Sequence, residues 1–122
     1  MELSAAQRER YERNLLVEGF TDRMQQALIA ARVAVVGAGG LGSAALNYLV
    51  AAGVGHLTLI ENDTVSLSNL QRQVLYTTAD MGRPKAEVAA MRLSRLNPGC
   101  DIRVVTDRLT AANAAGLLGG HD

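Results

Sequence analysis

The sequence contains very little cysteine. Cys100 is the single cysteine among 122 residues, so the chain can form neither an internal disulfide framework nor a cysteine-rich zinc site from its own residues. Proteins without disulfides are typical of reducing compartments. We therefore expect a cytoplasmic protein, and the sequence assigns no metal ligand to any residue.

The chain also lacks an excess of charge of either sign. Twelve Lys and Arg residues balance twelve Asp and Glu residues, whereas proteins that hold nucleic acid or anionic lipid by bulk electrostatics are usually strongly basic. Neither nucleic acid nor a membrane is therefore an expected partner. The basic residues are unevenly spread. Residues 33–71 contain none, and a group of them follows directly, namely Arg72, Arg83, Lys85, Arg92 and Arg95.

No targeting or membrane segment is evident. The N-terminus, Met-Glu-Leu-Ser followed by charged residues, lacks the basic and then apolar regions of a signal peptide. Residues 33–55 are uncharged over a length that could span a membrane, but they include six glycines together with Ser43, Asn47 and Tyr48. Glycines grouped at turn positions indicate a buried strand, a turn and a packed helix instead.

The length fits one globular domain and is too short for two ordinary ones. Residues 1–31 are predicted to form a helical N-terminal arm. Ser4 followed by Gln7 is a capping-box pattern that opens a helix ending before Gly19. Asp22 suggests the start of a second helix. Residues 32–122 are predicted to form the domain itself.

The order of the remaining elements predicts an α/β, Rossmann-like fold, with a mostly parallel sheet and helices on both faces. Residues 32–37 are an apolar, β-branched run typical of a strand buried on both faces of such a sheet. Further strands are expected at 56–61 and 102–106, and helices at 41–52, 84–96 and 111–118. Residues 119–122 stand where a doubly wound fold would start another strand, so we expect the sequence to be truncated there.

A glycine-rich motif follows the first predicted strand. Gly37-Ala-Gly39-Gly40-Leu-Gly42 fits the pattern G-x-G-x-x-G between a strand and a helix. In such turns the first glycine permits a tight bend, the second lets the backbone approach a phosphate, and the third lets the helix pack against the strand. The helix N-terminus then offers free N–H groups to an anion. Glu61 closes the second strand about 20 residues later, where a carboxylate can bind ribose hydroxyls.

These features predict nucleotide binding but do not separate ATP from NAD or FAD. An ATP-binding protein and an NAD-dependent oxidoreductase domain are equally compatible with the glycine-rich motif and the acidic residue. A wholly structural role, in which the glycines only allow close packing, explains less. The strand, the helix and the acidic residue all stand in the order that nucleotide binding requires.

The residues after the second strand separate these alternatives. Residues 61–73, Glu-Asn-Asp-Thr-Val-Ser-Leu-Ser-Asn-Leu-Gln-Arg-Gln, closely resemble the acidic stretch and the S-N-L-x-R-Q motif of the ThiF/MoeB/HesA family. This family of adenylating enzymes is related to the ubiquitin-activating enzymes. The resemblance extends over almost the whole chain and is greatest to the molybdopterin-synthase adenylyltransferase branch. It includes residues 10–13, 37–42, 52–55, 82–85 and 97–98.

The resemblance implies an ATP site. In it Gly40 and its neighbours approach the nucleotide, Glu61 binds the ribose, and Asn69, Arg72 and Lys85 contact the phosphates. The nucleotide-binding set that the resemblance implies is Gly37, Gly39, Gly40, Gly42, Glu61, Asp63, Asn69, Arg72, Gln73 and Lys85. Many relatives have aspartate at the position of Glu61, so this chain keeps the carboxylate but extends its reach by one methylene.

The resemblance also implies a homodimer. Arg13 is similar to an arginine that reaches the triphosphate in the neighbouring subunit, so Arg13, Arg72 and Lys85 are the expected catalytic residues. Without the resemblance, Arg13 would be taken for an ordinary surface charge of a helix beside Glu9 and Glu12.

Lys85 and Arg72 are also unusual in their own right. Lys85 stands in a first helical turn after Pro84, where the helix macrodipole disfavours a cation by about 0.3 to 1 kcal/mol. A nearby anionic ligand would reverse this effect. Arg72 follows Asn69 in a polar run without an apolar period, which suits a loop that folds over a nucleotide and donates to phosphate oxygens. Taken alone, either residue could also be a solvated surface charge.

Members of this family adenylate the C-terminal carboxylate of a small ubiquitin-like or sulfur-carrier protein that ends in Gly-Gly, and they release pyrophosphate from MgATP. The parent protein is therefore expected to be an ATP-dependent adenylyltransferase with such a carrier as its partner. The Mg²⁺-binding aspartate of the family is expected beyond Asp122, so we expect the 122-residue chain to be inactive alone. The alternatives are an NAD-dependent oxidoreductase domain and a non-catalytic nucleotide-binding or dimerisation fragment.

Overall fold

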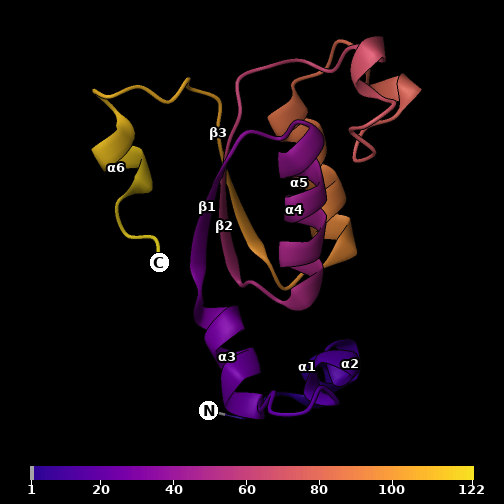
Figure 1. Cartoon of the computed structure of the whole chain (residues 1–122), viewed down its shortest axis with the longest axis vertical. Coiled ribbons are helices and arrows are strands. Elements are labelled where there is room, and N and C mark those ends of the chain that lie inside the picture. The colour runs from indigo at the N-terminus through magenta and orange to yellow at the C-terminus, as the bar shows by residue number, and fades with distance from the viewer. Residues whose placement is uncertain (1) are drawn as a thin grey trace.

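A parallel sheet of three strands forms the centre of the computed structural model, which describes residues 2–122 (Figure 1). The strands are β1 (Arg32–Val36), β2 (His56–Ile60) and β3 (Asp101–Val105), in the spatial order β1-β2-β3. They pair in register, so that all three end at the same edge of the sheet. The glycine-rich turn after β1 and the loop after β2 therefore start side by side.

The central strand is the one that is buried on both faces. Four of the five residues of β2 are buried, whereas β1 is partly exposed along its length and its Val36 is 53% exposed. The prediction that residues 32–37 are buried on both faces is therefore wrong for β1. Its apolar composition resembles that of a central strand, but among residues 2–122 the only strand that pairs with β1 is β2.

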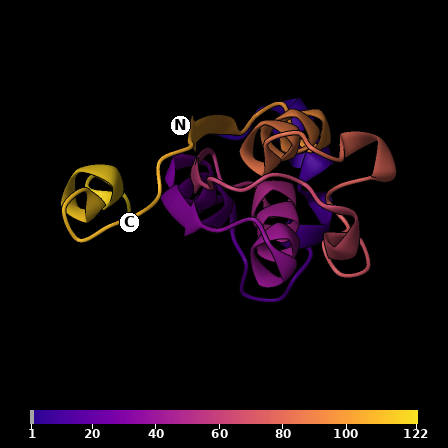
Figure 2. The ribbon, with the colours of Figure 1, turned by 90° about the horizontal axis from the view of Figure 1, so that it is seen from above.

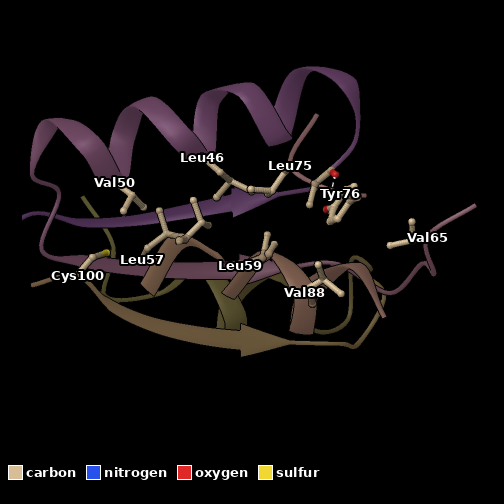
Figure 3. Packing of buried hydrophobic residues seen from close by; sticks show 13 residues of the cluster. Leu46, Val50, Leu57, Leu59, Val65, Leu75, Tyr76, Val88 and Cys100 are labelled. Carbon is tan, nitrogen blue, oxygen red and sulfur yellow. Dashed lines mark hydrogen bonds between the residues drawn. The ribbon is translucent and has the colours of Figure 1, made fainter. Parts of the chain in front are cut away.

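Two helices cover one face of the sheet. α4 (Gly40–Ala52) and α5 (Lys85–Leu96) lie together on this face (Figure 1, Figure 2). Their apolar residues pack against those of β2, and each fully buried leucine or valine contributes about 1.5 to 3 kcal/mol. The core includes Leu46, Val50, Leu57, Leu59, Val88 and Leu93 (Figure 3).

Within the described part of the chain, the opposite face of the sheet is covered only by one short helix and the segment that follows it. The last helix, α6 (Ala114–Leu118), stands on this side of the sheet (Figure 1, Figure 2). It is shorter than the predicted helix at 111–118. The following segment returns to the sheet, where His121 Nε2 lies 2.8 Å from the Thr58 hydroxyl. A cavity of about 220 Å³ remains between this segment and the strands. Helices on both faces and a parallel sheet confirm the predicted fold class.

The N-terminal arm consists of three short helices, α1 (Ala5–Arg10), α2 (Glu12–Leu15) and α3 (Asp22–Ala30). The predicted capping box of Ser4 and Gln7 is present. The first predicted helix is interrupted at Tyr11, whose side chain turns into the molecule. α3 begins at Asp22 as predicted, and the Thr21 hydroxyl, which accepts from the N–H of Met24, caps it.

Asn97 joins the arm to the core. This residue is 1% exposed, and its side-chain amide donates both to the Tyr11 hydroxyl at 2.8 Å and to the Val50 carbonyl at 2.9 Å. Each contact satisfies a buried polar group that would otherwise lower stability. Two segments that the sequence singled out by resemblance, residues 10–13 and 97–98, therefore meet at the C-terminal ends of α4 and α5.

A second group of contacts caps α4. Asn14 and Gln25 each donate a side-chain amide hydrogen to the Ala52 carbonyl at 3.0 Å, at the end of a helix where carbonyls lack partners. Gly53 ends the helix with φ of 108°, and a β-carbon there would lie 2.3 Å from Gln25 Nε2. Only glycine fits this position, because of both its backbone conformation and its neighbours.

None of the helices in the described part of the chain has both the length and the apolar character required to cross a bilayer. The uncharged run at 33–55 forms β1, the glycine-rich turn and α4, as the sequence predicts.

Candidate nucleotide-binding site

The glycine-rich turn brings the end of β1 close to the start of α4. Gly37 has φ of 93°, a left-handed conformation that favours glycine and permits the tight bend. A β-carbon at Gly42 would lie 2.1 Å from the Gly37 carbonyl oxygen. Gly42 therefore allows the helix to approach the strand closely, as the spacing of the motif predicts.

The same turn presents a row of backbone donors. The first backbone bond of α4 runs from the N–H of Ser43 to the carbonyl of Gly39, at 2.9 Å. Within residues 2–122 no acceptor contacts the N–H groups from Gly39 to Gly42, and no side chain caps the helix. Free N–H groups at the positive end of a helix of 13 residues are able to bind an anion.

An open pocket of about 660 Å³ lies beside these donors. It is lined by Val36, Leu41, Arg72 and the glycines of the turn. A β-carbon at Gly39, which lines this pocket, would meet only Gln73 Nε2, at 3.6 Å, so the fold itself leaves room for a side chain there. The volume lies within the range of about 300 to 1,000 Å³ that is usual for small-ligand sites.

The loop at 61–84 connects β2 to α5 and returns to its starting point. An isolated β-bridge between Thr64 and Pro84 closes its neck. The backbone bonds there run from Val65 N to Arg83 O at 2.9 Å and from Gly82 N to Val65 O at 2.8 Å. Two of the predicted phosphate-binding residues, Asn69 and Arg72, therefore lie on a compact loop with fixed ends, and Lys85 directly follows it as the first residue of α5.

Asn69 ends a short 3₁₀ helix, η1 (Leu67–Asn69), in this loop. Its side-chain oxygen accepts from the N–H and the hydroxyl of Ser66, at 3.1 and 3.0 Å. Because these bonds use Oδ1 of Asn69, its NH₂ group points away from Ser66. Ser66 was not among the predicted site residues, although its spacing of three from Asn69 is that of a capping box.

Arg72 lies over the start of α4. A β-carbon on Gly40 would be 3.7 Å from Arg72 Cγ and Cδ, so the stem of the arginine crosses the glycine-rich turn. Its guanidinium donates to the Ser68 carbonyl at 3.1 Å, which leaves most of its N–H donors for other acceptors. The structure thus places the positive charge of Arg72 beside the free backbone donors.

Gln73 lies beneath the same turn. It is 4% exposed, and its side-chain nitrogen faces Gly39. Its Oε1 is one of the buried side-chain atoms for which the described residues supply no hydrogen-bond partner. A buried acceptor of this kind usually has a partner such as water or a ligand.

Lys85 and Asp63 form an ion pair at the neck of the loop. Lys85 is 4% exposed, and its Nζ lies 3.3 Å from Asp63 Oδ2. The Thr64 N–H and then the Lys85 ammonium hold the pKa of Asp63 below its ordinary value. The anion that the position of Lys85 predicts is therefore present within the chain itself.

Glu61 and Tyr76 lie at the edge where β2 ends. The N–H of Glu61 donates to the Val105 carbonyl at 3.0 Å, which continues the sheet by one bond. Burial and the nearby charge of Glu61 raise the pKa of Tyr76. The Tyr76 hydroxyl donates to the Ala38 carbonyl at 2.8 Å. Sequence reasoning missed Tyr76, because it follows the apolar Leu75 and therefore resembles an ordinary core residue.

Asp80 fastens the far side of the loop to α5. It is 2% exposed, ends the 3₁₀ helix η2 (Thr78–Asp80), and accepts from Thr77 N at 2.8 Å and from Arg92 Nη2 at 2.7 Å. Burial acts to raise the pKa of Asp80, but the Thr77 donors and Arg92 outweigh it and lower the pKa. Sequence reasoning also missed Asp80, although Thr77 and Asp80 have capping-box spacing.

Arg13 is not near the other predicted site residues. It is exposed on α2, next to Asn14, which contacts Ala52 at the C-terminal end of α4. The glycine-rich turn is at the opposite end of that helix (Figure 1). A helix of 13 residues spans about 20 Å. Arg13 therefore lies outside the reach of the pocket in its own chain.

No metal centre is built from the described residues. Across residues 2–122, the structure brings together no group of three or more His, Cys, Asp or Glu side chains that could hold an ion.

Comparison with known proteins identifies similar sequences. The ThiF family pattern matches residues 11–122. The chain is 50% identical over 121 residues to the molybdopterin-synthase adenylyltransferase of Escherichia coli K12, covering 99% of this chain and 49% of that protein. It is 49% identical over 114 residues to the sulfur carrier protein adenylyltransferase of Thermus thermophilus, covering 93% and 42%. The chain thus spans about half the length of the curated relatives that it matches.

Solved structures with the same fold contain adenine nucleotides. The chain superposes on the E. coli tRNA N6-threonylcarbamoyladenosine dehydratase TcdA in complex with ATP, with a TM-score of 0.91 and 35% identity over 99% of this chain and 49% of that one. It also superposes on E. coli MccB with ATP, with a TM-score of 0.85 and 29% identity over 93% and 35% of the two chains. None of the relatives named here is an NAD-dependent oxidoreductase, so that alternative is not supported.

Proposed function

This chain belongs to the ThiF family, and we propose on that basis that it is the ATP-binding part of an adenylyltransferase. In this proposal residues 32–122 are the nucleotide-binding domain and residues 1–31 are an arm that serves a neighbouring subunit. The observation that carries the proposal is the row of free N–H groups from Gly39 to Gly42, with the Arg72 side chain lying across it. Relatives of about twice this length are named as adenylyltransferases.

The proposed reaction joins a carboxylate to the α-phosphorus of ATP. An oxygen of the C-terminal carboxylate of a carrier protein ending in Gly-Gly forms the new P–O bond, and the bond to the β-phosphate oxygen breaks. The products are an acyl-adenylate and pyrophosphate. Such a transfer depends mainly on positioning and on neutralising charge on the phosphates. The names of the relatives, which include molybdopterin-synthase and sulfur carrier protein adenylyltransferases, support a sulfur-carrier or ubiquitin-like partner.

The residues of the pocket suit the positioning of ATP and the neutralisation of charge on its phosphates. The backbone donors at Gly39 and Gly40 face the phosphates, and the guanidinium of Arg72 and the NH₂ group of Asn69 donate to them from above. Lys85 adds a positive charge that Asp63 holds in place. Gln73 contributes its buried amide beneath Gly39. Glu61 accepts from the ribose at the edge of the sheet.

Mg²⁺ would neutralise charge on the departing pyrophosphate. In such sites Mg²⁺ usually keeps several waters and is otherwise bound by phosphate oxygens and by one or two carboxylates. We propose that the ion is held by the triphosphate and by a protein carboxylate outside residues 2–122, where the resemblance places an aspartate.

A homodimer fits the position of Arg13. Arg13 lies at the end of α4 remote from its own pocket, so in this proposal it serves the pocket of a second chain. α4 contains no charged residue, and its outer face exposes Leu41 (91%) and Tyr48 (78%). A helix face of this kind suits an isologous contact between two copies. A cytoplasmic location agrees with the single cysteine, Cys100.

A nucleotide panel tests the proposed site. ATP should raise the unfolding temperature more than NAD does, because NAD presents only a diphosphate to Arg72 and Lys85. Equal stabilisation by both nucleotides, or a preference for NAD, would contradict the proposal.

Pyrophosphate exchange tests the reaction. The full-length enzyme should exchange pyrophosphate into ATP only when a carrier ending in Gly-Gly is present, and Arg72→Ala should abolish this exchange. ATP binding without any exchange would favour the non-catalytic alternative.

A further inference from the structure

The Tyr76 hydroxyl links two segments of the nucleotide site that are far apart in the sequence. Tyr76 is 3% exposed and lies beside Leu75 in the core beneath α4 (Figure 3). Its hydroxyl donates to the carbonyl of Ala38, which is fully buried, at 2.8 Å. Ala38 lies in the glycine-rich turn between the first two glycines of the motif.

This bond fixes the orientation of one peptide group. The carbonyl of Ala38 and the N–H of Gly39 belong to the same trans peptide, and in a planar trans peptide these two groups point in opposite directions. Because the carbonyl points to Tyr76 in the core, the Gly39 N–H must point away from the core. Gly39 lines the open pocket, and no acceptor within residues 2–122 contacts its N–H.

The backbone of Tyr76 completes the link. The N–H of Tyr76 donates to the Gln73 carbonyl at 3.2 Å, and the N–H of Gln73 donates to the Asn69 carbonyl at 2.9 Å. Tyr76 therefore follows directly on the turns that carry Asn69 and Arg72. Tyr76 thus contacts the glycine-rich turn through its side chain and the loop at 61–84 through its backbone.

The hydroxyl stays protonated, so it remains a donor. Burial, with the charge of Glu61, raises the pKa of Tyr76 well above the ordinary value of 10.0 for tyrosine. No other donor contacts the Ala38 carbonyl in the described structure. Removal of this hydroxyl would leave a buried carbonyl without a partner, and the peptide between Ala38 and Gly39 could then rotate.

We propose that Tyr76 is a positioning residue of the nucleotide site, which directs the Gly39 N–H at the phosphates and sets the distance between the glycine-rich turn and the Arg72 loop. The inference rests on the proposed ATP site. It adds a role for a residue that does not itself touch the nucleotide. It also accounts for a hydroxyl in a position where phenylalanine would fill the same volume.

Tyr11 provides a matched control. It is buried to a similar degree, at 5% exposed, and its hydroxyl also makes a hydrogen bond of 2.8 Å, accepting from Asn97. It stands between α1 and α2, which lie at the other end of the molecule from the start of α4 (Figure 1). Tyr76→Phe and Tyr11→Phe each remove one buried hydroxyl, so they should lower the unfolding temperature by similar amounts.

The experiment compares ligands in the full-length protein. For Tyr76→Phe we expect the dissociation constant of ATP to rise about tenfold, and that of adenosine to change less than about twofold, because adenosine lacks phosphates. Tyr11→Phe should change neither constant by more than about twofold. Normal ATP affinity in Tyr76→Phe, or an equal loss in both variants, would overturn the proposal.

Two further variants separate this inference from the proposed function. If Arg72→Ala weakens ATP binding and Tyr76→Phe does not, the ATP site stands and the role of Tyr76 is wrong. If neither Arg72→Ala nor Gly39→Val affects ATP binding, both proposals fail.

Amide hydrogen exchange tests the direction of the N–H without a mutation, and so serves even if Tyr76→Phe does not fold. In the wild-type protein the Gly39 amide should exchange rapidly without nucleotide and become protected when ATP is added. An amide that is already protected without ATP would show that the N–H points into the protein, which would contradict the inference.

Discussion

Gly39 and Gly42 stand in the same turn, but a side chain would affect them in different ways. At Gly42 a β-carbon would collide with the Gly37 carbonyl, 2.1 Å away, whereas at Gly39 it would meet only the end of Gln73 at 3.6 Å. The first contact involves backbone and cannot relax cheaply, but the second is an ordinary van der Waals distance. Gly42 is thus needed for the fold, whereas the fold alone does not require a glycine at position 39.

We therefore expect Gly39→Val to abolish ATP binding while the domain stays folded. Its side chain would occupy the path of the phosphates without displacing backbone. Gly42→Ala, as the contrasting variant, should lower the unfolding temperature. The measurements are an ATP titration and a thermal melt of each variant. Normal ATP binding by folded Gly39→Val would show that the turn is not the site.

Lys85 is a buried charge with a single carboxylate partner, Asp63, whose side chain is 67% exposed. A cation so placed can attract a second anion from the solvent side. Lys85→Ala should then weaken ATP binding by about tenfold or more while adenosine binding changes little. Isothermal titration with both ligands provides the test. An equal loss for ATP and adenosine would indicate a folding effect instead of a phosphate contact.

The loop at 61–84 behaves as an element of its own, because its contacts are concentrated at a few points. Leu75 and Tyr76 are buried in the core, a β-bridge closes the neck, and Asp80 bonds to Arg92 on α5. The intervening residues, which carry Asn69 and Arg72, are mostly exposed. Such a loop keeps its position through its anchors and leaves its donors accessible.

Asp80→Asn tests one of these anchors through pH. The folded-state pKa of Asp80 lies below its ordinary value of 3.8, so its charge adds stability above about pH 4, and this stability is lost as pH falls through the folded value. Near pH 7 the variant should be less stable by about 2 kcal/mol. The difference should shrink below about pH 4.

Denaturant unfolding at several pH values measures this effect. Asp101, whose side chain is 86% exposed, offers the control Asp101→Asn, which should change little at any pH. A stability difference for Asp80→Asn that remains constant into the acidic range would mean that the ionised carboxylate is not what the loop depends on.

At the level of elements, the sequence predicts the features that depend only on neighbouring residues. The apolar run of β1, the capping box at Ser4 and the glycine at the end of α4 all predict what the structure contains. The break at Tyr11 and the exposure of Val36 were not predictable in this way, because they depend on contacts with distant segments. Tyr11 turns inward to meet Asn97, which is 86 residues away.

In the candidate site, too, the sequence predicts the features with a local cause and misses those that depend on distant contacts. The backbone geometry of the glycine-rich turn follows from the motif, and the loop after β2 lies over that turn as its resemblance to the family predicts. Tyr76 acts through a long-range contact with Ala38, so no spacing in the sequence identifies it. The spacing of Thr77 and Asp80 indicates their capping box, but it does not indicate the bond from Arg92 to Asp80. The pairing of Lys85 with Asp63 was also missed, since position in a helix predicts that an anion is needed but not which group supplies it.

On the scale of the whole molecule, the pocket and the arm occupy opposite ends. Arg13 is held at the arm end by the contacts of Asn14 with Ala52 and of Tyr11 with Asn97. If Arg13 completes the pocket of a second subunit, each active site needs residues from two chains. A subunit with a defective pocket can then still lend its Arg13 to a partner.

Mixing of variants tests this arrangement in the full-length enzyme. Arg13→Ala and Arg72→Ala should each be inactive in pyrophosphate exchange. When the two are unfolded and refolded together, half of the dimers should be mixed and each should contain one intact site, which restores about a quarter of the wild-type activity. No recovery, with mixed dimers demonstrated by mass spectrometry, would mean that Arg13 acts within its own chain or not at all.

The length of the relatives leads to a further prediction. This chain covers 49% of the E. coli adenylyltransferase, so residues that bind the carrier and the metal are expected in the remaining part. Loss of one charge-stabilising group typically lowers a rate by about 10²-fold or more. The 122 residues alone should therefore bind ATP but show no carrier-dependent exchange. Robust exchange by them would place the whole catalytic unit within this chain.

The outer edge of β1 has a consequence for how the protein behaves in concentrated solution. Arg32 directs its N–H and carbonyl to this edge, where both bond to Asp122 at 2.9 and 2.8 Å. Ala34 and Val36 point the same way along the strand, and within residues 2–122 their backbone groups on this edge have no partner. An apolar strand with free donors and acceptors is a template for adding further strands. Unless another segment covers this edge, purified chains should associate through intermolecular β-structure. A charged residue in place of Val36 should reduce this association.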